Sequence, residues 1–140
     1  MKRKLPILLL ALLALSSCEV IIFDDDPWVI IDDRDQFVGA YRVSEYSRTF
    51  DAYHDFVIDV VKDRGDNNVI YIRNFYGDGI EVFGNVNGER LVIPAQNVGP
   101  YIIQGTGSCF LGSFILDYTV EYNGPDTYFL DDLSANTNRL

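Results

Sequence analysis

Residues that many enzymes and metalloproteins depend on are scarce in this sequence, which has one histidine and two cysteines among 140 residues. A zinc site of the usual kind and a Ser-His-Asp relay both need imidazole at particular positions, so neither is expected. The one histidine, His54, stands between Tyr53 and Asp55, and we place it at the surface. The glycine-rich stretch 105–112 lacks the lysine of a phosphate-binding loop and the third glycine of a dinucleotide fingerprint. We therefore expect no catalytic residue, no metal and no cofactor, and we expect that the protein is not an enzyme.

Basic residues are also few, with 11 Lys and Arg against 21 Asp and Glu, so that the formal net charge at pH 7 is −10. A field of this sign repels phosphate backbones, which excludes nucleic acid as a partner. The acidic residues supply many chance pairs, but a glycosidase needs two carboxyl groups that flank one bond. Most of these residues alternate outward from apolar rows or lie in turns, so we assign no such pair.

The apolar run Leu5–Leu15 is too short to cross a membrane, because a spanning helix needs about 18 apolar residues. It follows a basic start and ends in Leu15-Ser16-Ser17-Cys18, a pattern that resembles the bacterial lipobox. The resemblance implies that residues 1–17 are a lipoprotein signal peptide and that cleavage falls between Ser17 and Cys18. Cys18 would then carry a diacylglyceryl group and acyl chains such as palmitate. A plain secretory signal is the alternative.

Removal of residues 1–17 takes away three basic residues and no acidic one, which leaves eight against 21 and a formal charge of −13. The acyl chains on Cys18 are therefore expected to provide the membrane attachment. Residues 18–35 are rich in aspartate and are predicted to form an acidic lipid-anchored tether. Calcium binding is the alternative for the aspartates, but the sequence has no EF-hand loop.

An acidic stretch after a lipidated cysteine resembles the export signals of some Gram-negative lipoproteins. The resemblance implies a place in the cell envelope, lipid-anchored to the outer membrane. Whether the protein faces the periplasm or the cell surface stays open.

From Phe37 onward, apolar and polar residues alternate with a period of two, and turn residues interrupt the pattern about every ten positions. Turns such as Asn87-Gly88-Glu89 favour hairpins between neighbouring strands. We therefore predict that residues 36–140 form an all-β domain, an antiparallel up-and-down meander of about eight strands in a small barrel or half-barrel. A β-sandwich is the alternative. The expected strands cover residues 37–47, 52–62, 69–75, 80–87, 90–95, 101–107, 113–122 and 127–131.

Three segments of this domain carry a family resemblance: Phe37-Val38-Gly39-Ala40-Tyr41, Val69-Ile70-Tyr71-Ile72-Arg73-Asn74-Phe75-Tyr76-Gly77 and Val86-Asn87-Gly88-Glu89-Arg90-Leu91-Val92-Ile93-Pro94. Together they resemble the small lipocalin-like lipoproteins of Gram-negative bacterial envelopes. The resemblance implies a lipocalin-like barrel on a lipid tether, in a family whose members mostly have no assigned activity. The sequence departs from true lipocalins in that Tyr41 takes the place of a tryptophan, and we expect no basic residue to close the barrel opposite it.

The chain is rich in aromatic residues, with nine Tyr, nine Phe and one Trp. Aromatic residues that alternate along strands are first of all core residues. Six tyrosines instead fall near turns or on the opposite face of a strand, and they are candidates for a ligand or partner surface at a barrel mouth: Tyr46, Tyr53, Tyr71, Tyr76, Tyr101 and Tyr128.

These observations lead us to expect a non-catalytic binding or accessory domain for a small apolar ligand, a glycan or an envelope protein partner. The alternative is a structural envelope component without a ligand pocket. Cys109 has no partner inside the chain once Cys18 is lipidated, and it is expected to act as a small buried hydrophobe.

Overall fold

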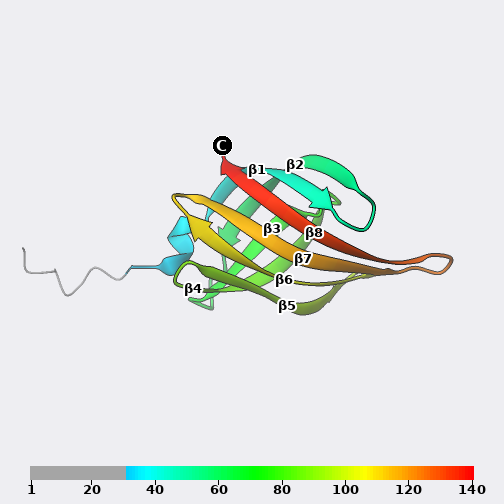
Figure 1. Cartoon of the computed structure of the whole chain (residues 1–140). Coiled ribbons are helices and arrows are strands. Elements are labelled where there is room, and N and C mark those ends of the chain that lie inside the picture. The colour runs from blue at the N-terminus through cyan, green and yellow to red at the C-terminus, as the bar shows by residue number, and fades with distance from the viewer. Residues whose placement is uncertain (1–30) are drawn as a thin grey trace, which may run out of the picture. The chain divides into compact units, whose positions relative to one another are not determined.

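The computed structural model describes residues 31–140, which form one closed antiparallel β-barrel (Figure 1). A short 3₁₀ helix, η1 (Asp33–Gln36), precedes the strands. The strands are β1 (Gly39–Ser47), β2 (Ala52–Lys62), β3 (Val69–Phe75), β4 (Ile80–Asn87), β5 (Arg90–Val98), β6 (Tyr101–Phe110), β7 (Ser113–Asn123) and β8 (Tyr128–Arg139). Each strand pairs with the next, and β8 pairs with β1. The all-β up-and-down prediction is confirmed, and the sandwich alternative is wrong.

The strand alternation places the apolar row of each strand inside the barrel. In β7, Phe114, Leu116, Tyr118 and Val120 are buried, as the sequence pattern predicts. The same inward row exists in β8, but there it is made of Leu133, Ala135 and Thr137 between polar neighbours. Because small and polar residues weaken the alternation, the sequence prediction ended this strand at residue 131, whereas β8 continues to Arg139.

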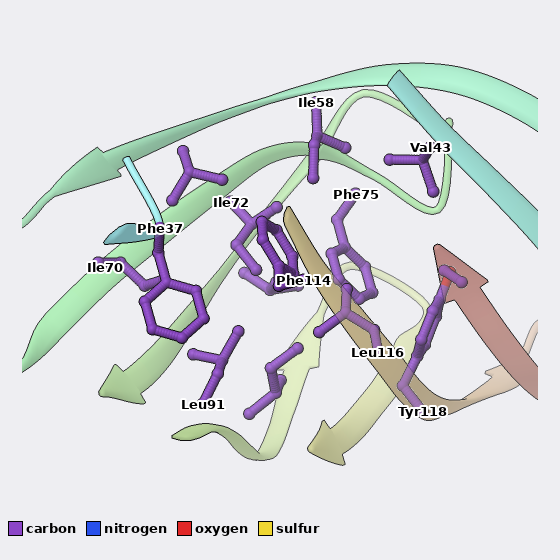
Figure 2. Close-up of a cluster of buried hydrophobic side chains, with 14 of the residues drawn as sticks. Phe37, Val43, Ile58, Ile70, Ile72, Phe75, Leu91, Phe114, Leu116 and Tyr118 are labelled. Carbon is purple, nitrogen blue, oxygen red and sulfur yellow. The ribbon is translucent and has the colours of Figure 1, made fainter. Parts of the chain in front are cut away.

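Apolar side chains fill the interior. Figure 2 shows ten labelled members of this core pointing toward one another, and they come from strands all around the barrel and from the segment before β1. The rings of Tyr41 and Phe114 meet edge to face with their centroids 4.9 Å apart, and those of Phe75 and Tyr118 lie 4.7 Å apart. A cavity among the core side chains has a volume of only about 10 Å³, which is about one water molecule. This cavity is far too small for a small-molecule ligand.

The two ends of the barrel differ. The plugged end holds η1, the start of β1 and the β2–β3, β4–β5 and β6–β7 turns. The mouth holds the β1–β2, β3–β4, β5–β6 and β7–β8 turns. No helix among residues 31–140 is long and apolar enough to cross a membrane.

Arg34 in η1 ties the plugged end together. Its side chain is 8% exposed, and its Nη1 donates hydrogen bonds to the carbonyl oxygens of Asp63, Asp66 and Val69 at 3.0, 2.7 and 3.3 Å. The Asp32 carboxylate pairs with the same guanidinium at 2.7 Å. A buried arginine that satisfies three backbone carbonyls and one carboxylate fixes η1 against the β2–β3 turn.

Other contacts hold the rest of η1. Lys62 Nζ lies 2.8 Å from Asp32, and the hydrogen bonds from Arg34 and Lys62 hold the pKa of Asp32 well below its usual range. Gln36 donates to the carbonyl oxygen of Gly88 at 2.5 Å. The last residues of the stretch expected as a tether, from Asp32 on, are thus built into the barrel. Its residues 18–30, like the lipobox, lie outside the described part of the chain.

The expectation that no basic residue closes the barrel opposite Tyr41 is wrong. The Arg139 guanidinium lies over the Tyr41 ring, 5.0 Å from its centroid. It also donates to the carbonyl oxygens of Gln36 at 2.9 Å and Val38 at 2.7 Å. Sequence analysis missed this contact because Arg139 is far from Tyr41 along the chain and lay beyond the expected end of the last strand.

Replacement of Arg34 by methionine is expected to lower the free energy of unfolding by about 2–4 kcal/mol, because three carbonyls and the Asp32 carboxylate lose their partner. Urea denaturation followed by circular dichroism measures this loss. Arg42→Met, on the exposed outer face of β1, is the matched control and should change stability by less than about 0.5 kcal/mol. Equal losses in the two variants would contradict the role given to Arg34.

Candidate functional site

A pocket of about 300 Å³ opens at the mouth, where β2 separates from β3. The two strands pair only between Asp59 and Lys62 of β2 and their partners in β3, so the mouth-side part of β2 packs beside the β3–β4 turn without being paired to β3. The residues that line the pocket are Glu45, His54, Asp55, Phe56, Tyr76, Gly77, Asp78 and Tyr101.

The β3–β4 turn is shaped by residues with positive φ, among them Asn74 at 57°, Tyr76 at 58° and Gly77 at 64°. The Asn74 side chain holds the turn, since its Nδ2 donates to the Val57 carbonyl at 2.7 Å and its Oδ1 accepts from the Gly79 amide at 2.9 Å. A Cβ on Gly77 would lie 3.3 Å from the Phe56 ring, so the turn lies directly against β2. Tyr76 is held at the pocket by this packing.

A buried polar cluster lies beneath the pocket. Glu45 of β1 is 1% exposed and accepts a hydrogen bond from the Tyr118 hydroxyl. Ser47 donates to Asp131 Oδ1 at 2.5 Å, and Tyr76 donates to Asp131 Oδ2 at 2.9 Å. Burial raises the pKa of Glu45, and burial together with the nearby Glu45 raises the pKa of Tyr118. Two carboxyl groups are therefore held inside the mouth by hydroxyl donors.

Aromatic rings continue along the mouth from the pocket. Tyr76 and Tyr101 meet edge to face at 6.1 Å, and Tyr101 and Tyr122 lie 5.5 Å apart. The Tyr101 hydroxyl donates to Asp78 at 2.6 Å, which raises the pKa of Tyr101 to about 12. The pocket thus combines two tyrosine rings with carboxylate groups.

The structure brings only two of the six candidate tyrosines, Tyr76 and Tyr101, into this pocket. Tyr46 and Tyr53 form a cross-strand pair near the mouth with ring centroids 4.7 Å apart, and Tyr53 is 77% exposed. The other two lie elsewhere: Tyr128 is 63% exposed at the start of β8, and Tyr71 is on β3 toward the plugged end. The six tyrosines therefore do not form one surface.

Sequence reasoning missed the acidic residues that point inward. Glu45 and Ser47 belong to the same every-second-residue row of β1 as Tyr41 and Val43, and this row faces the interior. Their positions in the alternation were therefore the one sequence signal that could have identified them as inward-facing. Asp131 was taken as the end of a strand, whereas it lies within β8 and faces the interior.

The structure places Cys109 inside the barrel and His54 at its mouth. Cys109 is 4% exposed, and burial raises the pKa of its thiol, so it is the small buried hydrophobe that the sequence predicted. His54 is exposed, as the sequence predicted; it lies opposite Glu45 in the β1–β2 pairing and lines the pocket.

A second surface hollow and a metal site are the alternatives to the pocket at the mouth. A hollow of about 410 Å³ on the outer wall, over β4 to β7, is lined by no aromatic side chain, so it lacks the combination found at the mouth. Within residues 31–140, no group of three His, Cys, Asp or Glu side chains lies close enough together to hold a metal ion.

No protein-family model matches the chain, and comparison with curated proteins gives no match. The interpretation of the site therefore depends on its geometry and chemistry.

Glu45→Gln is expected to change how stability depends on pH. A raised pKa means that Glu45 holds its proton more tightly in the folded protein than in the unfolded chain. The protonated side chain therefore contributes to folding stability below the unfolded pKa of about 4.3, and this stability is lost as pH rises through the folded pKa. Glutamine keeps the neutral form at every pH. The variant should therefore gain stability relative to the wild type between pH 4 and pH 8.

Thermal and urea unfolding at a series of pH values measure this gain. Glu81→Gln, which removes an exposed carboxylate that pairs with Arg73, is the control and should show no such gain. A Glu45→Gln curve that runs parallel to the wild type would contradict the argument.

Proposed function

We propose that the protein is a lipid-anchored lipoprotein of the Gram-negative cell envelope whose barrel is a non-catalytic binding domain. The mouth pocket would take a small ligand that carries a positive charge. The observation that carries this proposal is the meeting of the exposed carboxylates of Asp55 and Asp78 with the rings of Tyr76 and Tyr101 in one pocket of about 300 Å³.

The chemistry of the lining favours a cation over an apolar molecule. Carboxylates attract positive charge, and a partly enclosed pocket screens this attraction less than open water does. Tyrosine faces attract ammonium groups through their π electrons. The cavity among the core side chains, by contrast, measures only about 10 Å³, which is too small for an apolar ligand. A glycan or a protein segment with an amino group also meets these requirements.

The anchor is supported by the sequence of the N-terminal segment. The basic start, the short apolar run and the Leu15-Ser16-Ser17-Cys18 motif together resemble a lipoprotein signal. Two or more acyl chains hold a protein on a membrane, whereas a single chain binds reversibly. The proposal therefore places the barrel at the outer membrane, tethered through Cys18.

A structural envelope component without a ligand is the second candidate function. The filled interior favours it, because a barrel that serves only as a spacer needs no cavity. The two candidates differ in what the mouth pocket does.

Titration with benzyltrimethylammonium, followed by NMR chemical shifts, distinguishes them. A ligand of this size bound by charge and ring contacts should show a Kd on the order of 1 mM, while benzoate and benzyl alcohol should bind at least about tenfold more weakly. Higher salt should weaken the binding of the cation. Absence of shifts at the mouth with all three probes would favour the structural component.

Asp78→Asn and Asp55→Asn should each weaken binding of the cation about threefold, since each removes one exposed carboxylate from the pocket. Glu89→Gln is the control, because its exposed carboxylate lies in the β4–β5 turn at the opposite end of the barrel. Equal effects of the three substitutions would contradict the assignment of the pocket.

Labelled palmitate tests the anchor. Cells that express the full chain should incorporate the label into the protein, and Cys18→Ser should abolish both the label and the membrane fraction of the protein. Cys109→Ser serves as the control, because Cys109 is buried and should not be acylated. A wild-type protein without label would contradict the anchor.

A further inference from the structure

The β6–β7 turn exposes two large apolar side chains, Phe110 at 74% and Leu111 at 89% exposure. We call this pair the apolar tip. The turn has two central residues, Leu111 and Gly112, with φ of 49° and 77°, and Phe110 pairs with Ser113. Positive φ at both central residues is typical of a type I′ turn.

Leucine is a poor choice at this place for folding alone. The first central residue of a type I′ turn is usually asparagine, aspartate or glycine, because other side chains are strained at positive φ. Leu111 has a positive φ in spite of this strain, and its side chain is exposed to water. A turn that gives up stability to present an apolar side chain points to a partner that covers it.

The apolar tip lies where the chain enters the barrel. The Arg139 guanidinium donates to the Gly112 carbonyl at 3.3 Å and also to the carbonyl oxygens of Gln36 and Val38. The β6–β7 turn and η1 accordingly lie at the same end of the barrel in Figure 1. Arg139 therefore fastens the tip to the segment that continues toward Cys18.

The reach of the chain allows this end to touch a membrane. Residue 31 is 13 positions after Cys18, and 13 residues span at most about 45 Å when fully extended. A barrel anchored through Cys18 thus stays close to the lipid surface, with its chain entry and apolar tip on the tethered side. Ile31, at the same end, is also 81% exposed.

We propose that the apolar tip inserts into the lipid bilayer beside the anchor. Phe110 and Leu111 enter the boundary between headgroups and acyl chains, and the mouth pocket then faces away from the membrane. This inference rests on the proposed anchor at Cys18, which brings the barrel to the membrane, but not on the ligand proposed for the mouth.

The test uses residues 18–140, which contain every strand pairing and the whole core of the barrel. The Cys18 thiol is coupled chemically to a maleimide lipid in phosphatidylcholine vesicles, so the result does not depend on acylation in the cell. In a Trp28→Phe background, tryptophan replaces Phe110 or, as the matched control at the opposite end, Phe50, which is 53% exposed. Brominated phosphatidylcholine quenches tryptophan that enters the bilayer.

We expect quenching of the Phe110→Trp protein to exceed that of the Phe50→Trp protein at least about fivefold, with a blue shift of the emission only in the former. Addition of Leu111→Asn should reduce the quenching severalfold and leave the midpoint of thermal unfolding unchanged or higher, because asparagine suits the turn. Equal quenching at the two positions, or quenching that Leu111→Asn does not change, would overturn the proposal. Failure of palmitate labelling in cells would instead count against the anchor alone.

Discussion

The pairing of β8 with β1 is the contact on which the rest of the structure depends. It runs from Tyr41 and Arg139 at the plugged end to Ser47 and Leu133 near the mouth. The pairing removes the two open edges that a meander of strands otherwise exposes. It also places Glu45 and Ser47 of β1 beside Asp131 of β8, so the polar cluster under the mouth pocket exists only because the barrel is closed.

Closure with a filled interior restricts binding to the surface and the ends of the barrel. At one end, Arg34 and Arg139 satisfy backbone carbonyls and seal the entry of the chain. At the other end, the pairing of β2 with β3 stops, and the pocket beside the β3–β4 turn holds the exposed carboxylates of Asp55 and Asp78 next to tyrosine rings. In the two proposals made above, one end of this closed barrel approaches lipid and the other end takes a charged ligand. This asymmetry is consistent with a tethered protein that presents its pocket to the solvent.

Much of the fold could be predicted because alternation and turn chemistry act locally. The inward row of β7 and the positive φ of Gly88 follow from neighbouring residues. The parts of the fold that could not be predicted depend on weak patterns or on residues distant in sequence. The second half of β8 consists largely of small and polar residues, and Arg139 contacts Tyr41 only once the barrel is closed. In the site, the sequence predicted that six tyrosines lie outside the core. Which of them line the pocket depends on where β2 stops pairing with β3, and that point brings in Tyr76 and Tyr101. No local pattern encodes where this pairing stops.

The most direct test of the account is whether β1 and β8 pair in solution. Nuclear Overhauser effects across the two strands, measured on isotope-labelled protein, report this pairing without any substitution. Closure predicts cross-strand contacts between Val43 and Thr137 and between Glu45 and Ala135, which are opposite each other in the register. Absence of these contacts, with amides of residues 133–139 that exchange as fast as an unpaired edge, would contradict the closed barrel and the site built on it.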